Sequence, residues 1–230
     1  MTRTFKALSA LLSYPTAELQ AAIPEIVTVL DREALLPKDA LSALSPLLVS
    51  LHTGSLIDAQ ERYVFLFDRS RTLSLCLFEH VHGDSRDRGG AMVDLLETYR
   101  AGGFELTTNE LPDHLPVLLE YLAHRPLGEA RAMLGETTHI LAALAERLER
   151  RGSPYKAVFA ALTALAASPA DIEALRALAA VPMDDPADLA ALDAVWDEAA
   201  VTFGPDPNAG CPASRDMLNR MAQPTQTAAE

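Results

Sequence analysis

Hydrophobic residues recur at every third or fourth position along most of the chain, which is the spacing of one face of a helix. In the first 70 residues this pattern predicts helices over residues 4–13, 16–30, 38–51 and 55–67. Pro24 and Pro46 lie inside two of these stretches, where the missing N–H predicts a kink or a break. Large apolar side chains give the fourth helix a core-facing side, and we expect three of them to be buried: Tyr63, Leu66 and Phe67.

The same spacing predicts six further helices in the rest of the chain. Ser85 is the predicted N-cap of the first, which ends at Gly102–Gly103. Asp113 is the predicted N-cap of the second, because Pro116 then falls at the third helical position, where a missing N–H is harmless. The remaining four are expected over residues 126–150, 155–166, 168–178 and 186–201.

The predicted fold class is all-α, a single-domain helical bundle of about nine to ten helices. No stretch alternates apolar and polar residues with period two for long enough to build a sheet, although residues 73–78 could be extended. The helical domain is expected to span residues 1–203. The predicted flexible C-terminal tail covers residues 204–230, because its apolar side chains are too few to offset the entropy of ordering the chain.

Charge and composition restrict the partners of the chain. The formal net charge of -13 argues against binding to nucleic acid or an anionic membrane, although acidic residues on solvated helix faces would give the same value. No window reaches the ~18 to 20 apolar residues of a membrane span, and the first residues lack a signal-peptide pattern. We therefore expect a cytoplasmic protein without membrane insertion. Cys76 and Cys211 form no metal or disulfide motif and are expected to be free thiols.

Candidate chemistry is concentrated in two clusters of polar residues. The first follows the apolar run 73–78 and contains Glu79, His80, His82, Asp84, Arg86, Asp87 and Arg88. The second begins about one helix later and contains Glu110, Pro112, Asp113 and His114. Imidazole and carboxylate groups suit zinc, iron or manganese, so an all-α metal-dependent hydrolase that uses the His/Asp cluster is one interpretation.

Other observations weaken this enzymatic interpretation. On a helix, His80 and His82 would point about 200° apart, and no spacing in the clusters matches an established metal motif. The chain contains no phosphate-binding glycine loop and no GxSxG elbow. We therefore assign no catalytic residue, no metal and no cofactor from the residues alone.

The two clusters also resemble a known family. The stretches LFEHVHGDSRDRGGAMVDLL and ELPDHLPVLLEYL are similar to those of NarJ-type proteins, the assembly chaperones of respiratory nitrate reductase, which belong with the TorD and DmsD chaperones of molybdoenzymes. The motif shared by these families is represented by Glu110, Pro112, Asp113 and His114. A second mark, an aromatic residue followed by a Leu-Phe pair, is represented by Tyr63, Leu66 and Phe67. The resemblance extends to Trp196 and fades in the tail, and Asp84 stands where the family pattern has Glu.

The resemblance implies a chaperone that is not an enzyme. Its client would be the N-terminal segment of the catalytic subunit of nitrate reductase, held in the cytoplasm until iron–sulfur clusters and the molybdenum cofactor are inserted. An amphipathic client helix would lie in an apolar groove, and carboxylates would hold its basic residues. The acids expected at this groove are Glu79, Asp84, Asp87, Glu110 and Asp113.

Some features of this implied function stay open. A TorD-like chaperone for another molybdoenzyme fits the same motif, and the protein could be a monomer or a weak homodimer. His80, His82 and His114 titrate near neutral pH, so pH-dependent release of the client is a further hypothesis.

Overall fold

The computed structural model describes residues 1–83, 86–107, 109–185, 187–188 and 190. These residues form eleven α-helices and no strand, which confirms the all-α prediction. The helices are α1 (Arg3–Leu11), α2 (Ala17–Glu33), α3 (Lys38–Thr53), α4 (Leu56–Tyr63), α5 (Leu77–His82), α6 (Arg86–Ala101), α7 (Leu115–Ala123), α8 (Leu127–Glu136), α9 (Thr138–Arg150), α10 (Lys156–Leu165) and α11 (Ile172–Ala180). The helix predicted over residues 186–201 lies almost wholly outside the described residues.

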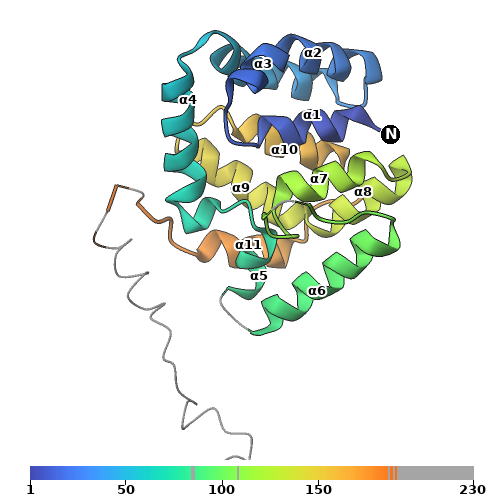
Figure 1. Cartoon of the computed structure of the whole chain (residues 1–230). Coiled ribbons are helices and arrows are strands. Elements are labelled where there is room, and N and C mark those ends of the chain that lie inside the picture. The colour runs from blue at the N-terminus through green and yellow to red at the C-terminus, as the bar shows by residue number, and fades with distance from the viewer. Residues whose placement is uncertain (84–85, 108, 186, 189, 191–230) are drawn as a thin grey trace, which may run out of the picture. The chain divides into compact units, whose positions relative to one another are not determined.

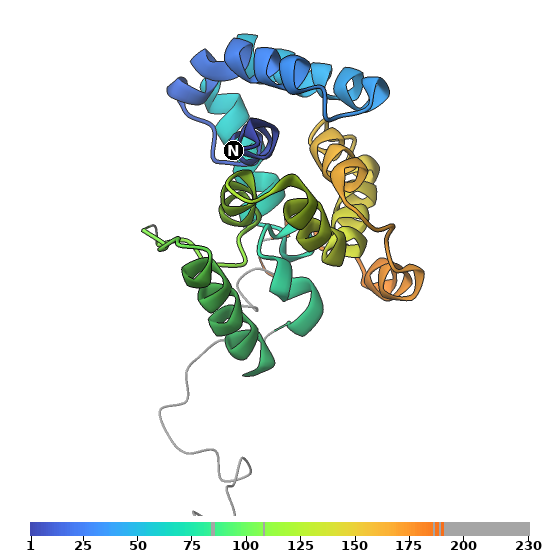
Figure 2. The same ribbon diagram turned by 90° about the vertical axis from the view of Figure 1, so that its right-hand side faces the viewer.

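All eleven helices belong to one compact unit, Met1–Ala187, and a second unit comprises Asp188–Glu230. Within the first unit, α1 packs against α2 and α7, and α10 packs against α9 and α3 (Figure 1). The helix α6 packs mainly against α5 and lies apart from α9 and α10 (Figure 2). The predicted boundary between residues 203 and 204 falls outside the described residues and stays a prediction.

The core is built from the apolar faces that the periodicity predicted. Phe5, Leu8 and Leu11 of α1 have no exposed surface, and each such side chain contributes roughly 1.5–3 kcal/mol by burial. Two local signals of the sequence are also confirmed. Thr16 accepts a hydrogen bond from the Leu19 N–H at the start of α2, and Ser55 begins α4 in the same way.

The fourth predicted helix changes geometry before it ends. The α-helical part stops at Tyr63 and continues as a π-helix, η1 (Val64–Asp68). Leu66 and Phe67 are buried in the core, while Phe65 remains 41% exposed. The expectation that Tyr63, Leu66 and Phe67 belong to the core is therefore confirmed. The Tyr63 hydroxyl donates to the Leu12 carbonyl at 2.9 Å.

The continuity of the predicted helical regions differs from expectation in two respects. The helix expected over residues 126–150 is divided into α8 and α9, because the hydroxyls of Thr137 and Thr138 bond the carbonyls of Leu134 and Gly135. Of the kink or break expected at Pro24 and Pro46, the break does not occur, since α2 and α3 run through these residues without interruption. No helix of the described residues has both the length and the apolar character needed to cross a membrane.

Candidate functional site

The two polar clusters of the sequence lie next to each other in the fold. Residues before α5 pair with residues before α7 through an isolated antiparallel bridge between Cys76 and His114. The Leu115 N–H donates to the Leu75 carbonyl at 2.9 Å, and the Leu77 N–H donates to the Asp113 carbonyl at 3.1 Å. This short pairing fixes the start of α5 against the start of α7.

Asp113 lies at the centre of this junction with no exposed surface. Its Oδ2 accepts the Phe78 N–H at 3.0 Å, and its carbonyl accepts the Leu77 N–H. These are the first two N–H groups of α5, so the carboxylate caps a helix that is remote in sequence and is favoured by the positive end of that helix. The second carboxylate oxygen, Oδ1, is buried without a hydrogen-bond partner.

The predicted start of α7 was therefore wrong in its detail. His114, not Asp113, occupies the N-cap position of α7, and its side chain makes no capping bond. Pro116 then falls at the second helical position rather than the third. The reason is tertiary, because the pairing with residues 75–77 turns the Asp113 carboxylate toward the N-terminus of α5.

Pro112 has a structural role beside this junction. It is buried, and its carbonyl accepts a hydrogen bond from the Tyr99 hydroxyl at 2.7 Å. The Tyr99 ring lies 4.6 Å from the ring of Tyr121, measured between centroids. Gly102 permits this packing, since a Cβ there would approach Tyr121 to 2.8 Å. The end of α6 is thus held against α7.

Glu110 and His114 face an open groove of about 390 Å³. We call it the acidic groove, because its lining includes the carboxylates of Asp68, Glu110 and Glu120 and no Lys or Arg. The remaining lining comes from α1, Tyr14, Tyr63 and the start of α7. The groove therefore presents the carboxylates of Asp68 and Glu110 beside aromatic and aliphatic surface, while the carboxylate of Glu120 forms an ion pair with Lys6 at 3.2 Å.

The ionisation of the acidic groove reflects its partial burial. Burial lowers the pKa of His114, although the charges of Glu110, Asp113 and Asp68 oppose this effect. Burial, together with the charge of Glu110, raises the pKa of Asp68. The Nδ1 of His114 lies 3.6 Å from a carboxylate oxygen of Glu110, which is too far for a hydrogen bond.

Glu79 and His80 lie on a different side of the junction. They line a small cavity of about 160 Å³ with Arg71, Thr72 and Arg147. The Nε2 of His80 donates to the Ser74 carbonyl at 2.8 Å, and burial lowers the pKa of this histidine. Glu79 forms an ion pair with Arg88 at 3.3 Å. These side chains are engaged with their own neighbours and do not face the acidic groove.

Of the rest of the first cluster, the structure places His82 partly buried and Asp87 at the surface. The ring of His82 packs against that of Phe78 at 5.9 Å between centroids, and Asp87 is exposed on α6. Asp84, its neighbour Ser85 and the side chain of Arg86 lie outside the described residues. The structure therefore divides the predicted site into a buried cap, a groove and a separate polar cavity.

The described residues offer no support for metal chemistry. Nowhere among them do three His, Cys, Asp or Glu side chains lie close enough together to hold a metal ion. Cys76 is a free thiol, and burial raises its pKa to about 12, so it is protonated near neutral pH. The hydrolase interpretation thus lacks its ligand set in this part of the chain.

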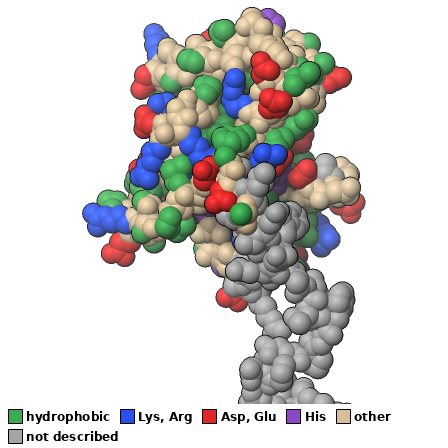
Figure 3. All heavy atoms as spheres, turned by 90° about the vertical axis from the view of Figure 1, so that its left-hand side faces the viewer, with side chains coloured by type: hydrophobic (Ala, Val, Ile, Leu, Met, Phe, Trp, Pro, Cys, Tyr) green, Lys and Arg blue, Asp and Glu red, His purple; other side chains and the backbone are tan. Residues whose placement is uncertain are grey.

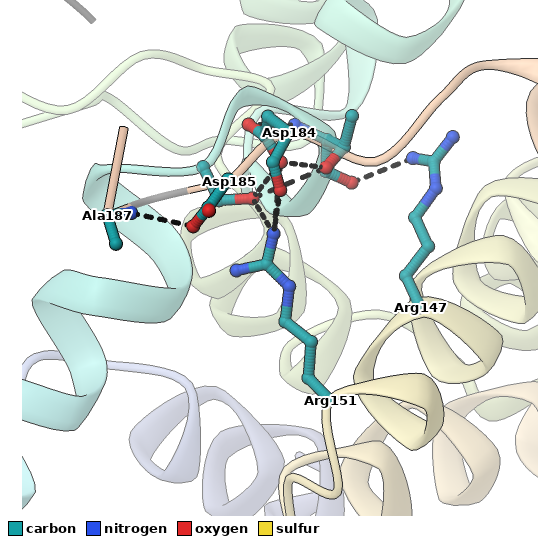
Figure 4. A network of polar contacts seen from close by, with 7 residues as sticks. Arg147, Arg151, Asp184, Asp185 and Ala187 are labelled. Atoms are coloured by element: carbon teal, nitrogen blue, oxygen red, sulfur yellow. Dashed lines mark hydrogen bonds and ion pairs between the residues drawn. The ribbon is translucent and has the colours of Figure 1, made fainter. Parts of the chain in front are cut away.

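A polar network that the sequence did not predict surrounds Asp184, which follows α11 in the chain (Figure 4). Arg151 donates through Nη2 to the carboxylate of Asp184 at 3.1 Å and to its carbonyl at 2.7 Å. The hydroxyls of Ser70 and Thr72 donate to the same carboxylate. The partners are more than 30 residues apart in sequence, and no local pattern could have linked them.

Arg147 extends this network into the core. Its guanidinium is buried and donates to the carbonyls of Thr72 at 2.7 Å and Leu178 at 2.6 Å. Together the two arginines join α9, the turn before α5 and the segment after α11 (Figure 4). This network supports the wall of the small cavity that His80 lines.

Comparisons with known proteins agree on one family. A family model described as nitrate reductase delta subunit matches residues 16–161. The nitrate reductase molybdenum cofactor assembly chaperone NarJ of Escherichia coli (strain K12) is 45% identical over 216 residues, which cover 94% of this chain and 91% of the relative. The probable assembly chaperone NarW of the same organism is 39% identical over 210 residues, with 91% and 87% covered.

A more distant relative carries the same name. The probable nitrate reductase molybdenum cofactor assembly chaperone NarJ of Bacillus subtilis (strain 168) is 35% identical over 159 residues, which cover 66% of this chain and 82% of the relative. The names describe assembly factors and not catalysts. The chain therefore belongs to the family of nitrate reductase molybdenum cofactor assembly chaperones.

Proposed function

We propose that this protein is a cytoplasmic assembly chaperone that binds the N-terminal segment of the catalytic subunit of respiratory nitrate reductase. It holds this client until the iron–sulfur clusters and the molybdenum cofactor are inserted, and then leaves. The names of the relatives support nitrate reductase as the partner. They also favour this client over that of a TorD-like chaperone for another molybdoenzyme.

The observation that carries the proposal is the acidic groove. It combines three carboxylates with apolar surface from Tyr14, Pro116 and Val117. An amphipathic helix with basic residues fits such a surface, because its apolar face is buried while its cations lie near the carboxylates. Glu110 and His114 would contact the client directly.

The remaining residues of the two clusters do not all contact the client, and several instead position the residues that do. Asp113 and Pro112 are buried and hold the segment that carries Glu110 and His114. Asp87 is exposed on α6, where a longer client could reach it. Glu79, His80 and Arg88 are held by internal contacts, and we assign them to the support of α5.

The test is a calorimetric titration of the protein with a peptide from the N-terminus of the catalytic subunit. The parent protein should bind saturably, and Glu110→Lys should weaken binding by about tenfold or more, since it places a cation against a cationic peptide. Glu25→Lys is the matched control. It makes the same charge change, but Glu25 is exposed on α2 and does not line the groove. The absence of binding to the parent would refute the proposed function.

A further inference from the structure

Two further hollows along α4 and η1 follow the acidic groove, each sharing lining residues with the one before it. Tyr14 lines both the acidic groove and a hollow of about 690 Å³. Arg62 and Phe65 line that hollow and a third one of about 470 Å³. We call the two added hollows the α4 furrow, lined chiefly by Tyr14, Ile57, Arg62, Phe65 and Arg69. None of these residues belongs to the two polar clusters of the sequence.

The α4 furrow exposes large apolar side chains in succession. Tyr14 is 47% exposed, Ile57 is 65% exposed and Phe65 is 41% exposed. Single exposed apolar residues are ordinary on protein surfaces, whereas three that line one hollow indicate an interaction surface. The face that carries α4 shows hydrophobic side chains interspersed with basic and acidic ones (Figure 3). Phe65 lies within the π-helical turn η1, and π-turns are frequent at functional sites.

The α4 furrow also differs from the acidic groove in charge. Arg62 and Arg69 form no ion pair with a carboxylate of the described residues, and Arg62 donates a hydrogen bond to the Ser50 hydroxyl at 2.9 Å. Asp58 and Glu61 line the larger hollow with the two arginines, and the smaller hollow holds Arg151, Asp184 and Asp185, so both signs of charge are present in the furrow. The acidic groove is lined by carboxylates and His114, with no Lys or Arg. The surface thus changes along its length from negative to mixed charge, and no carboxylate of the described residues forms an ion pair with either guanidinium group.

We propose that the α4 furrow binds the second part of the client segment whose basic part lies in the acidic groove. The apolar face of the client packs on Phe65 and Tyr14, and a client carboxylate lies between Arg62 and Arg69. An exposed aromatic side chain beside an arginine has the composition of an interface hot spot. This inference rests on the proposed function and adds the position and the chemistry of a second contact region.

The experiment is a fluorescence-anisotropy titration with the labelled N-terminal peptide of the catalytic subunit. Phe65→Ala should weaken binding by about tenfold, because it removes the central apolar contact. Val93→Ala is the matched control, since Val93 is 53% exposed on α6 and lines no part of the furrow. Thermal unfolding of both variants separates a loss of binding from a loss of folding.

A double-mutant cycle tests the charged contact. Arg69→Glu, and separately a peptide whose Asp and Glu side chains are replaced by amides, should each weaken binding several-fold. The two changes together should weaken it no further than either change alone. If the parent binds, Glu110→Lys weakens binding and Phe65→Ala has no effect, the furrow is not a client surface although the proposed function stands. If the parent protein does not bind the peptide, the proposed function and the furrow proposal are both refuted.

Discussion

At the scale of single residues, Asp113 shows how a motif residue can act through structure. Its carboxylate is fully buried and caps α5 across a sequence separation of 35 residues. Local reasoning identified the residue type as a cap, but it could not identify which helix is capped. The loss of this residue would disturb both α5 and the segment that carries Glu110 and His114.

We predict that Asp113→Ala lowers the free energy of unfolding by about 1–2 kcal/mol, because the Phe78 N–H loses its acceptor. Asp113→Asn keeps an acceptor oxygen and should lose less. Urea unfolding of the three proteins measures the difference. An alanine variant as stable as the parent would show that the cap contributes nothing.

A second residue-scale prediction concerns pH. The pKa of His114 is lowered by burial, so this side chain is neutral near pH 7 and gains its charge only below about pH 6.5. Burial raises the pKa of Asp68, which therefore loses its charge earlier than an ordinary carboxyl as the pH falls. Both changes make the acidic groove less negative on acidification.

Affinity for a basic client should therefore be highest near neutral pH and should decline several-fold as the pH falls through the lowered pKa of His114 and the raised pKa of Asp68. His114→Gln should flatten the upper part of this decline, because it removes the proton-binding ring. Titrations at a series of pH values check the profile. A tighter complex at the acidic end would contradict it.

At the scale of elements, the sequence predicted most helices because their apolar spacing and several of their N-caps are local signals. The exceptions have tertiary or geometric causes. Thr137 and Thr138 divide the expected long helix through hydroxyl bonds to carbonyls, and η1 inserts a π-turn after Tyr63. The contact between the end of α6 and α7 was also beyond prediction, because it depends on how closely Gly102 approaches Tyr121.

This contact gives a matched pair of glycine substitutions. Gly102→Ala should destabilise the protein by about 1–3 kcal/mol, since its Cβ would lie 2.8 Å from the Tyr121 side chain. Gly90→Ala should instead stabilise it by up to about 1 kcal/mol, because Gly90 lies within α6 with open space around it. Thermal unfolding of both variants checks the signs. Equal changes in the unfolding temperature of the two variants would argue against close packing of the end of α6 on α7.

At the scale of the whole molecule, the fold class could be predicted and the grouping of the site residues could not. The two clusters do meet, as the expectation of one client groove between them required. However, the backbone pairing around Cys76 and His114 sends Glu110 to one side and His80 to the other. The α4 furrow and the Asp184 network were not predicted, since each joins segments that are far apart in sequence.

The Asp184 network should hold the segment after α11 in place. Burial raises the pKa of Asp184, but hydrogen bonds from Thr72 and Ser70 and the charge of Arg151 outweigh burial and lower it. Asp184→Asn should therefore destabilise the protein by about 1–3 kcal/mol and speed amide exchange over residues 69–73 and 182–185. The stability difference should shrink in acid, as the parent carboxylate itself becomes protonated. Unchanged exchange would show that the network does not hold this segment.

The most direct test of the central claim is hydrogen–deuterium exchange of the protein with and without the N-terminal peptide of the catalytic subunit. The account predicts that the peptide slows exchange in the segments that surround the acidic groove and the α4 furrow, at residues 9–14, 57–69 and 110–120. Protection confined to residues 77–88, with none around Glu110 and Tyr14, would contradict it and would place the client on the side of His80.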